Sequence, residues 1–219
     1  MTVGRPPLDL SLYLVTDTRL CDDFGVSETV AAAVGAGATV VQLRDPASSD
    51  ADLVALGRAL VRRLAGSGVP LIVNDRVELV AAIGADGAHV GQGDQDVTTA
   101  RRVLGGGAHV GLSVQTPEHV DAAQRMDVDL DYLGVGPVWP QTTKPDAGAP
   151  SGLDRLAQII AVSPWPCVAI GGIGLGRVQP VRAVGAAGVA VVSAICGQPD
   201  PAAATRALRV EWDAAADAL

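Results

Sequence analysis

Short runs of Val, Ile, Leu and Ala alternate along the chain with longer segments that mix Ala and Leu with charged residues. Continuous apolar runs bounded by turn residues are typical of parallel strands that are buried on both faces. The pattern predicts strands at residues 12–15, 39–43, 70–73, 87–90, 109–112, 131–135, 167–170 and 188–192. It predicts helices near residues 28–36, 50–65, 77–83, 97–104, 117–125, 153–162, 175–185 and 201–217.

This repeating order of strand and helix indicates the fold class. Eight strand–helix repeats are compatible with a closed (β/α)₈ barrel or with an open doubly wound sheet. Eight is the strand count of the barrel, and no second domain is visible in the sequence. We therefore predict an α/β protein with a single (β/α)₈ TIM barrel over residues 1–219, in which residues 1–10 form a loose N-terminal segment.

Composition removes several classes of function. The net charge is −8 and no basic stripe interrupts it, so nucleic-acid binding has no electrostatic support. The longest uncharged stretch, residues 183–199, is interrupted by glycines, a Gln and a Pro, which argues against a membrane span. The cysteines lie far apart without metal-ligand spacing, so free thiols in a reducing compartment are expected. We expect a cytoplasmic protein that acts on small phosphorylated molecules without nucleic-acid or membrane partners, with a homodimer as one candidate assembly.

Polar residues or glycines follow the predicted strands where each apolar run ends. In chain order they are Asp17, Gln42, Arg44, Asn74, Asp75, Gln92, Asp94, Ser113, Thr143, Lys144, Gly171, Gly172 and Ser193. In a (β/α)₈ barrel the C-terminal ends of the strands converge on one face, and active sites lie there. The pattern therefore predicts an enzyme whose site is at this face.

Two of these residues are candidate metal ligands. Asp75 and Asp94 follow successive strands, so their carboxylates could share one cation. Hard oxygen ligands, with substrate phosphates completing the coordination shell, suit Mg²⁺. Taken separately, Asn74–Asp75 could be a turn and Asp94 a helix cap. Their common position at one rim favours a magnesium site.

The glycine-rich stretch AIGGIGLG, residues 169–176, indicates a phosphate site rather than a dinucleotide site. No Asp or Glu lies between it and Asp200, where a ribose-binding acid would be required. Glycines allow backbone N–H groups to approach a phosphate, and the loops after strands seven and eight form such a site in many barrels. We expect Gly172, Val192 and Ser193 to form it; a tight turn before a helix is the simpler alternative.

Two cations are further candidates for phosphate binding. Arg44 ends a buried strand, where an unpaired guanidinium is costly, so it must meet a ligand phosphate or a carboxylate such as Asp17 or Asp45. Lys144 is the only lysine of the chain. It could form a Schiff base, but its polar loop favours phosphate contact, and a solvated surface lysine is the remaining alternative.

With these stretches in view, the chain resembles the thiamine phosphate synthase family. The matching strings are YLVTD at 13–17, QLRD at 42–45, VND at 73–75, HVGQGD at 89–94, GLS at 111–113, GPVWPQTTK at 136–144, AIGGI at 169–173 and VVSAI at 191–195. The resemblance covers essentially the whole barrel. It implies a transferase that joins a hydroxymethylpyrimidine diphosphate to a thiazole phosphate and releases diphosphate.

The resemblance also implies a mechanism and residue roles. In the family, diphosphate departs first and leaves a methylene cation stabilised by the pyrimidine, which the thiazole nitrogen then attacks. Asp75 and Asp94 would bind Mg²⁺, and Gln42 would contact the pyrimidine. The diphosphate would be bound by Asn74 and by the three catalytic residues Arg44, Ser113 and Lys144. The thiazole phosphate would be bound by Thr143, Gly172, Val192 and Ser193.

Two positions depart from the family pattern and leave alternatives open. Members commonly carry Lys where this chain has Pro46, and Thr where it has Gln141. The loss of one diphosphate-binding ammonium should slow the reaction unless another cation compensates. The alternatives are a diverged homologue such as a thiazole tautomerase, a Schiff-base aldolase that uses Lys144, and a non-catalytic phosphate sensor. Retention of both aspartates and of the lysine favours the synthase.

Overall fold

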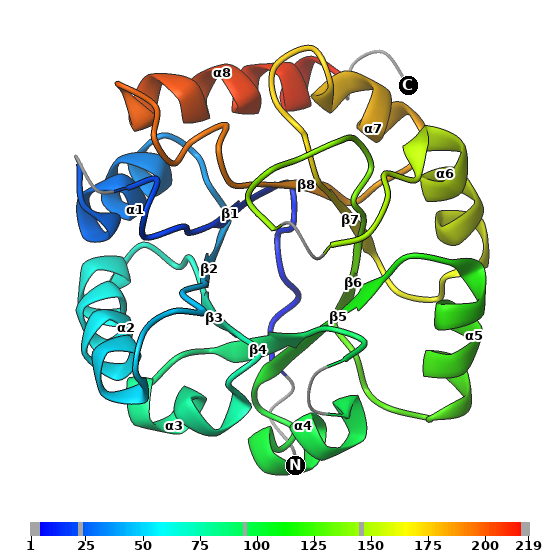
Figure 1. Cartoon of the computed structure of the whole chain (residues 1–219), viewed down its shortest axis with the longest axis horizontal. Coiled ribbons are helices and arrows are strands. Elements are labelled where there is room, and N and C mark those ends of the chain that lie inside the picture. The colour runs from blue at the N-terminus through cyan, green and yellow to red at the C-terminus, as the bar shows by residue number, and fades with distance from the viewer. Residues whose placement is uncertain (1–4, 22–23, 94–95, 145–146, 216–219) are drawn as a thin grey trace.

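The computed structural model describes residues 5–21, 24–93, 96–144 and 147–215, and these form one closed barrel (Figure 1). Within this part of the chain, eight parallel strands pair in chain order, and the last pairs with the first. The strands are β1 (Leu12–Val15), β2 (Val40–Leu43), β3 (Leu71–Asn74), β4 (Gly87–Val90), β5 (His109–Val114), β6 (Tyr132–Val135), β7 (Cys167–Ile170) and β8 (Gly188–Val191). The predicted (β/α)₈ fold class is confirmed.

The helices surround the barrel as an outer ring (Figure 1). They are α1 (Val26–Gly35), α2 (Asp50–Leu64), α3 (Val80–Ile83), α4 (Val97–Leu104), α5 (Pro117–Arg125), α6 (Gly152–Val162), α7 (Val178–Ala183) and α8 (Pro201–Ala214). A 3₁₀ turn, η1 (Val77–Leu79), precedes α3. No helix in the described ranges is both long enough and apolar enough to cross a membrane.

Helix α7 is shorter than the predicted helix at 175–185 because its start is set by tertiary contacts. Gly176 has a φ of +80°, which is outside the helical region. The Glu211 carboxylate of α8 accepts hydrogen bonds from the N–H groups of Gly176, Val178 and Gln179 at 2.9–3.1 Å. Because a carboxylate satisfies the first N–H groups of a helix well, α7 begins at this contact.

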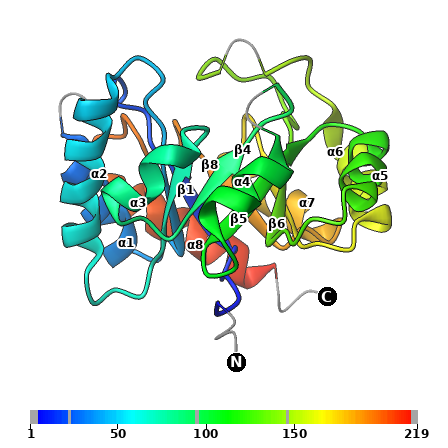
Figure 2. The same ribbon diagram turned by 90° about the horizontal axis from the view of Figure 1, so that it is seen from below.

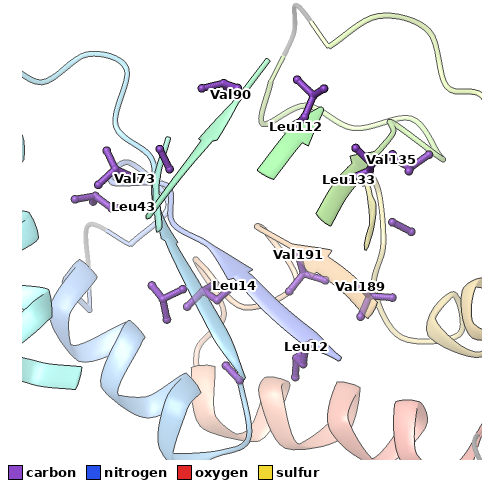
Figure 3. Close-up of a cluster of buried hydrophobic side chains, with 14 of the residues drawn as sticks. Leu12, Leu14, Leu43, Val73, Val90, Leu112, Leu133, Val135, Val189 and Val191 are labelled. Atoms are coloured by element: carbon purple, nitrogen blue, oxygen red, sulfur yellow. The ribbon is translucent and has the colours of Figure 1, made fainter. Parts of the chain in front are cut away.

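Successive residues of each strand face opposite sides of the barrel wall, which separates two apolar clusters. The larger cluster lies between strands and helices; its strand residues include those drawn in Figure 3, such as Leu12 and Leu14. The smaller cluster fills the barrel interior and includes Tyr13, Val15 and Tyr132. Strand β1 therefore places its apolar residues alternately outside and inside, which a fully apolar run cannot reveal by itself.

The segment expected to be loose at the N-terminus makes specific contacts from residue 5 onward; residues 1–4 lie outside the described ranges. Figure 2 shows this segment at the end of the barrel opposite the β6–α6 loop. Leu10 is 5% exposed, and its carbonyl oxygen lies where a side chain on Gly188 would have to fit. Arg5 pairs with Asp131 and with Asp129. The segment thus covers the bottom of the barrel.

Asp131 gives this bottom face a predicted dependence on pH. It accepts hydrogen bonds from Arg5, Arg101, His109 and the Val110 N–H. Burial alone would raise its pKa, but the hydrogen bonds from His109 and Arg5 outweigh burial and lower the pKa from 3.8 to about 2. Because the folded pKa lies below the unfolded one, the ionised carboxylate stabilises the fold above about pH 4, and this stabilisation is lost as the pH falls through about 2.

We expect Asp131→Asn to lower the free energy of unfolding by about 2 kcal/mol at pH 6 and by about half as much at pH 3. Urea unfolding at both pH values measures this difference. Asp129→Asn is the matched control, because Asp129 pairs with the same Arg5 but its side chain is 65% exposed. Equal losses at both pH values for Asp131→Asn would contradict the proposed titration.

Candidate functional site

The C-terminal ends of the strands open into a pocket of about 530 Å³. Every strand contributes to its lining, as expected for the active-site face of this fold. The predicted site residues that line it are Gln42, Arg44, Asn74, Asp75, Ser113, Thr143, Lys144, Gly172, Val192 and Ser193. Asp94 lies outside the described residues. One cavity therefore contains the candidate groups from six different strand ends and loops, while their individual roles stay predictions.

A chain of hydrogen bonds crosses the floor of this pocket. The Gln42 Nε2 amide donates to Tyr13 Oη at 2.9 Å, and Tyr13 Oη lies 2.7 Å from Tyr132 Oη. Tyr132 Oη lies 3.0 Å from His89 Nδ1, and His89 Nε2 lies 2.8 Å from Ser113 Oγ. Burial raises the pKa of both tyrosines well above the usual value, so both phenols stay protonated. We call these five residues the floor chain.

The floor chain has a direction that follows from its first donor. Because the Gln42 amide nitrogen can only donate, the Tyr13 hydroxyl accepts there and its own proton faces Tyr132. Tyr132 then donates to His89 Nδ1, which leaves the proton on His89 Nε2 to be donated to Ser113 Oγ. In consequence, Gln42 has its carbonyl oxygen and Ser113 its hydroxyl proton available for a ligand.

His89 is a site residue that the sequence pattern did not identify, because alternation alone could not orient it. It is 8% exposed and stacks on Tyr132 with ring centroids 5.4 Å apart. Side chains on Gly111 of the neighbouring strand β5 and on Gly134 of β6, the strand beyond it, would come within 3 Å of its ring. Glycines inside strands mark places where another group approaches closely. Gly111 and Gly134 were therefore the sequence feature that could have indicated the orientation of His89.

Arg44 is half-buried at the pocket wall, and no carboxylate within the described ranges forms an ion pair with it. Asp17 instead accepts from the N–H groups of Arg19 and Leu20 at 3.1 and 3.2 Å. Asp45 accepts from the Thr18 and Ser48 hydroxyls. Both carboxylates proposed as partners are thus engaged elsewhere, so of the two readings of Arg44 the geometry favours a ligand anion.

Asp75 stands at the pocket end of β3 in an uncommon backbone conformation. Its φ is +60°, and its N–H donates to the His89 carbonyl of β4 at 2.9 Å. The Asn74 amide donates to its carboxylate at 2.5 Å. Backbone strain in non-glycine residues is concentrated at functional sites. No group of three His, Cys, Asp or Glu side chains gathers anywhere in the described ranges.

The loop after β7 has the glycines that its close packing demands. A side chain on Gly172 would lie 2.5 Å from the Pro140 carbonyl oxygen and 2.8 Å from Trp139 Cβ. The Gly172 carbonyl accepts from Arg177, whose guanidinium lies over the Trp139 ring at 5.1 Å. Among the described residues, no acceptor is bonded to the N–H of Gly172 or of Ser193. Both residues line the pocket, and a backbone N–H without an acceptor is a candidate donor for an anion.

Comparisons with known proteins agree along the whole barrel. A family described as thiamine monophosphate synthase matches residues 12–195. Thiamine-phosphate synthases from Xanthobacter autotrophicus and Azorhizobium caulinodans are 49% and 46% identical over 203 residues, which make up 93% of this chain and 95% of each relative. The solved thiamine phosphate pyrophosphorylase from Pyrococcus furiosus has a TM-score of 0.85 at 32% identity, covering 94% of this chain and 97% of that one.

Proposed function

The chain belongs to the thiamine monophosphate synthase family, and we propose on this premise how its pocket performs the coupling reaction. The enzyme joins the pyrimidine and thiazole halves of thiamine phosphate. The observation that carries the proposal is that the candidate groups for both halves, and for the leaving diphosphate, line one pocket of about 530 Å³. The roles of the individual residues, the metal and the order of the steps are the content of the proposal.

The pyrimidine would bind at the floor of the pocket. Gln42 is 5% exposed, and the floor chain orients its carbonyl oxygen toward a ligand. An aminopyrimidine has an exocyclic N–H donor that matches this acceptor. Because the amide is fixed by Tyr13, little conformational entropy is lost on binding.

The diphosphate would bind above the pyrimidine, between Arg44, Ser113 and Lys144. Arg44 has no carboxylate partner in the described ranges, and the Ser113 hydroxyl proton is directed away from His89. Departure of the diphosphate builds up negative charge on its oxygens, which fixed cations and donors stabilise in the transition state. The residues act by charge and position, and no protein nucleophile is required.

The donor chemistry of the pocket fits Mg²⁺. Asp75 offers carboxylate oxygens, and a hard cation commonly binds one or two carboxylates together with substrate phosphates. Asp75 would bind it with Asp94, which lies outside the described residues. When bound, the ion would neutralise charge on the departing diphosphate. Asn74 orients the Asp75 carboxylate through the hydrogen bond between their side chains.

The thiazole phosphate would bind at the opposite side of the pocket, at the loops after β7 and β8. The N–H groups of Gly172 and Ser193 supply donors for it, with Thr143 and Val192 beside them. Anchored there, the thiazole would face the carbon that loses diphosphate. Two substrates bound at fixed positions react faster than two free molecules, because little orientational entropy remains to be lost.

Arg76 is our candidate for the cation that compensates for Pro46. Its guanidinium donates to the carbonyls of Ser48 at 2.7 Å and of Pro46 at 3.4 Å. Arg76 also pairs with the exposed Asp50 carboxylate at 3.2 Å, so its positive charge lies next to the loop position where family members commonly carry Lys but is partly neutralised there. It also orders the β2–α2 loop beside the pocket.

The test is an assay of the full chain with hydroxymethylpyrimidine diphosphate and thiazole phosphate. We expect thiamine phosphate and diphosphate in equal amounts, and a loss of at least about 10²-fold when Mg²⁺ is chelated, reversed when it is restored. Turnover that is unaffected by chelation would contradict the metal assignment. Binding of thiamine phosphate without turnover would support the sensor, and a borohydride-trapped adduct at Lys144 would support the aldolase.

A further inference from the structure

Gln141 is one of the two departures from the family pattern, and it makes three hydrogen bonds inside its own loop. Its Oε1 accepts from the Lys144 N–H at 2.8 Å and from the Thr143 hydroxyl at 3.1 Å. Its Nε2 donates to the Lys144 carbonyl. Gln141 is half-buried, and it lines the pocket together with both of its partners.

The consequence is that both backbone polar groups of Lys144 are bonded to one side-chain amide. The N–H and C=O of Lys144 belong to the two peptide units that flank its Cα, so hydrogen bonds to both restrict φ and ψ of Lys144 and with them the direction in which its side chain leaves the backbone. A threonine at position 141 has a single hydroxyl on a short side chain, which cannot accept and donate in the same way. Gln141 therefore offers a donor and an acceptor on separate atoms, which a single hydroxyl does not.

The two ends of this loop are held independently of Gln141. On one side, Arg177 connects Trp139 to the Gly172 carbonyl. On the other side, the Gln115 Nε2 amide of the β5–α5 loop donates to the Ala147 carbonyl at 2.9 Å. Between these anchors, Gln141 bonds to Lys144 and Thr143, and the Lys144 carbonyl also accepts from the Ala147 N–H at 3.1 Å. The hydrogen bond on the Lys144 N–H is the one that Gln141 alone makes in the described part of the loop.

We propose that Gln141 is a positioning residue for the reaction: it sets the backbone of Lys144 so that the only ammonium side chain of the enzyme is directed at the leaving diphosphate. This inference rests on the proposed function, because it requires a diphosphate substrate in this pocket. Gln141 touches no reacting atom and acts through Lys144. In a chain with Pro46 at the usual lysine position, the pre-set Lys144 carries more of the charge stabilisation.

The test is a double-mutant cycle in the full chain with Gln141→Met and Lys144→Ala. Met keeps the length of Gln but can neither donate nor accept at its end in the same way. Gln141→Met should lower kcat about tenfold when Lys144 is present. In the Lys144→Ala background the same change should cost less than about twofold, because the group that Gln141 positions is gone. Gln141→Thr should fall between wild type and Gln141→Met.

Equal losses in both backgrounds would overturn the proposal, since they would show a general structural role. So would unchanged kcat in Gln141→Met with Lys144 present. Amide hydrogen exchange gives a readout that needs no turnover: the Lys144 N–H should exchange faster in Gln141→Met and the loop ends should not. If the wild-type chain makes no thiamine phosphate, the proposed function fails, whereas faster exchange without a kinetic effect refutes only the positioning role.

Discussion

Asp75→Asn is expected to lower kcat/KM by at least about 10²-fold at saturating Mg²⁺ while the protein stays folded. The proposed magnesium site depends on the negative charge of this carboxylate, and the loss of one well-placed electrostatic group typically costs this much. Asn is the sharper substitution than Ala, because Asp75 has a φ of +60° and Asn tolerates the left-handed region. The variant thus removes charge without adding backbone strain. Steady-state kinetics over a range of Mg²⁺ concentrations measure the effect.

The chain offers a matched control for this substitution. Asp127 is the other non-glycine residue with positive φ in the described ranges, at +49°, and it is exposed in the turn after α5. Asp127→Asn should leave both kcat and KM unchanged. If Asp75→Asn turned over at the wild-type rate with the same dependence on Mg²⁺, the metal assignment would be wrong.

Arg44→Met should also reduce kcat/KM by about 10²- to 10³-fold, with the loss mainly in the step that releases diphosphate. Stability should be unchanged or slightly higher, because no carboxylate in the described ranges loses a partner and one half-buried charge is removed. Arg44→Lys should recover only part of the activity, because an ammonium cannot bind two phosphate oxygens in the planar geometry of a guanidinium. Kinetics and urea unfolding together separate these effects.

Arg206→Met serves as the control for loss of one positive charge, because Arg206 is exposed on α8. It should not alter turnover at physiological salt. A marked loss of stability in Arg44→Met would contradict the view that the guanidinium awaits a ligand anion. It would instead indicate a structural partner for Arg44 in the folded protein.

The sequence determined the fold and the face on which the site lies. Apolar runs of four to six residues, each followed by an amphipathic segment, indicate a parallel sheet covered by helices, because parallel strands buried on both faces need helices to cover them. Polar residues at the strand ends then share one rim, so Gln42, Arg44, Asn74, Asp75 and Ser113 could be assigned to one site from their positions alone. The family strings indicated roles for these residues, which stay predictions, and the family itself is confirmed.

Tertiary structure alone decided which groups are already paired and which remain for a ligand. The direction of His89 and the floor chain follow from three-dimensional neighbours in β1, β2, β5 and β6, which no local pattern encodes. In the same way, Asp17 and Asp45 form hydrogen bonds elsewhere, so neither neutralises Arg44 at the pocket wall. The contacts of Arg5 and Leu10 place the N-terminal segment under the barrel. The physical reason is that periodicity records the side of an element on which a residue lies, whereas hydrogen bonds and ion pairs depend on distances between elements far apart in the chain.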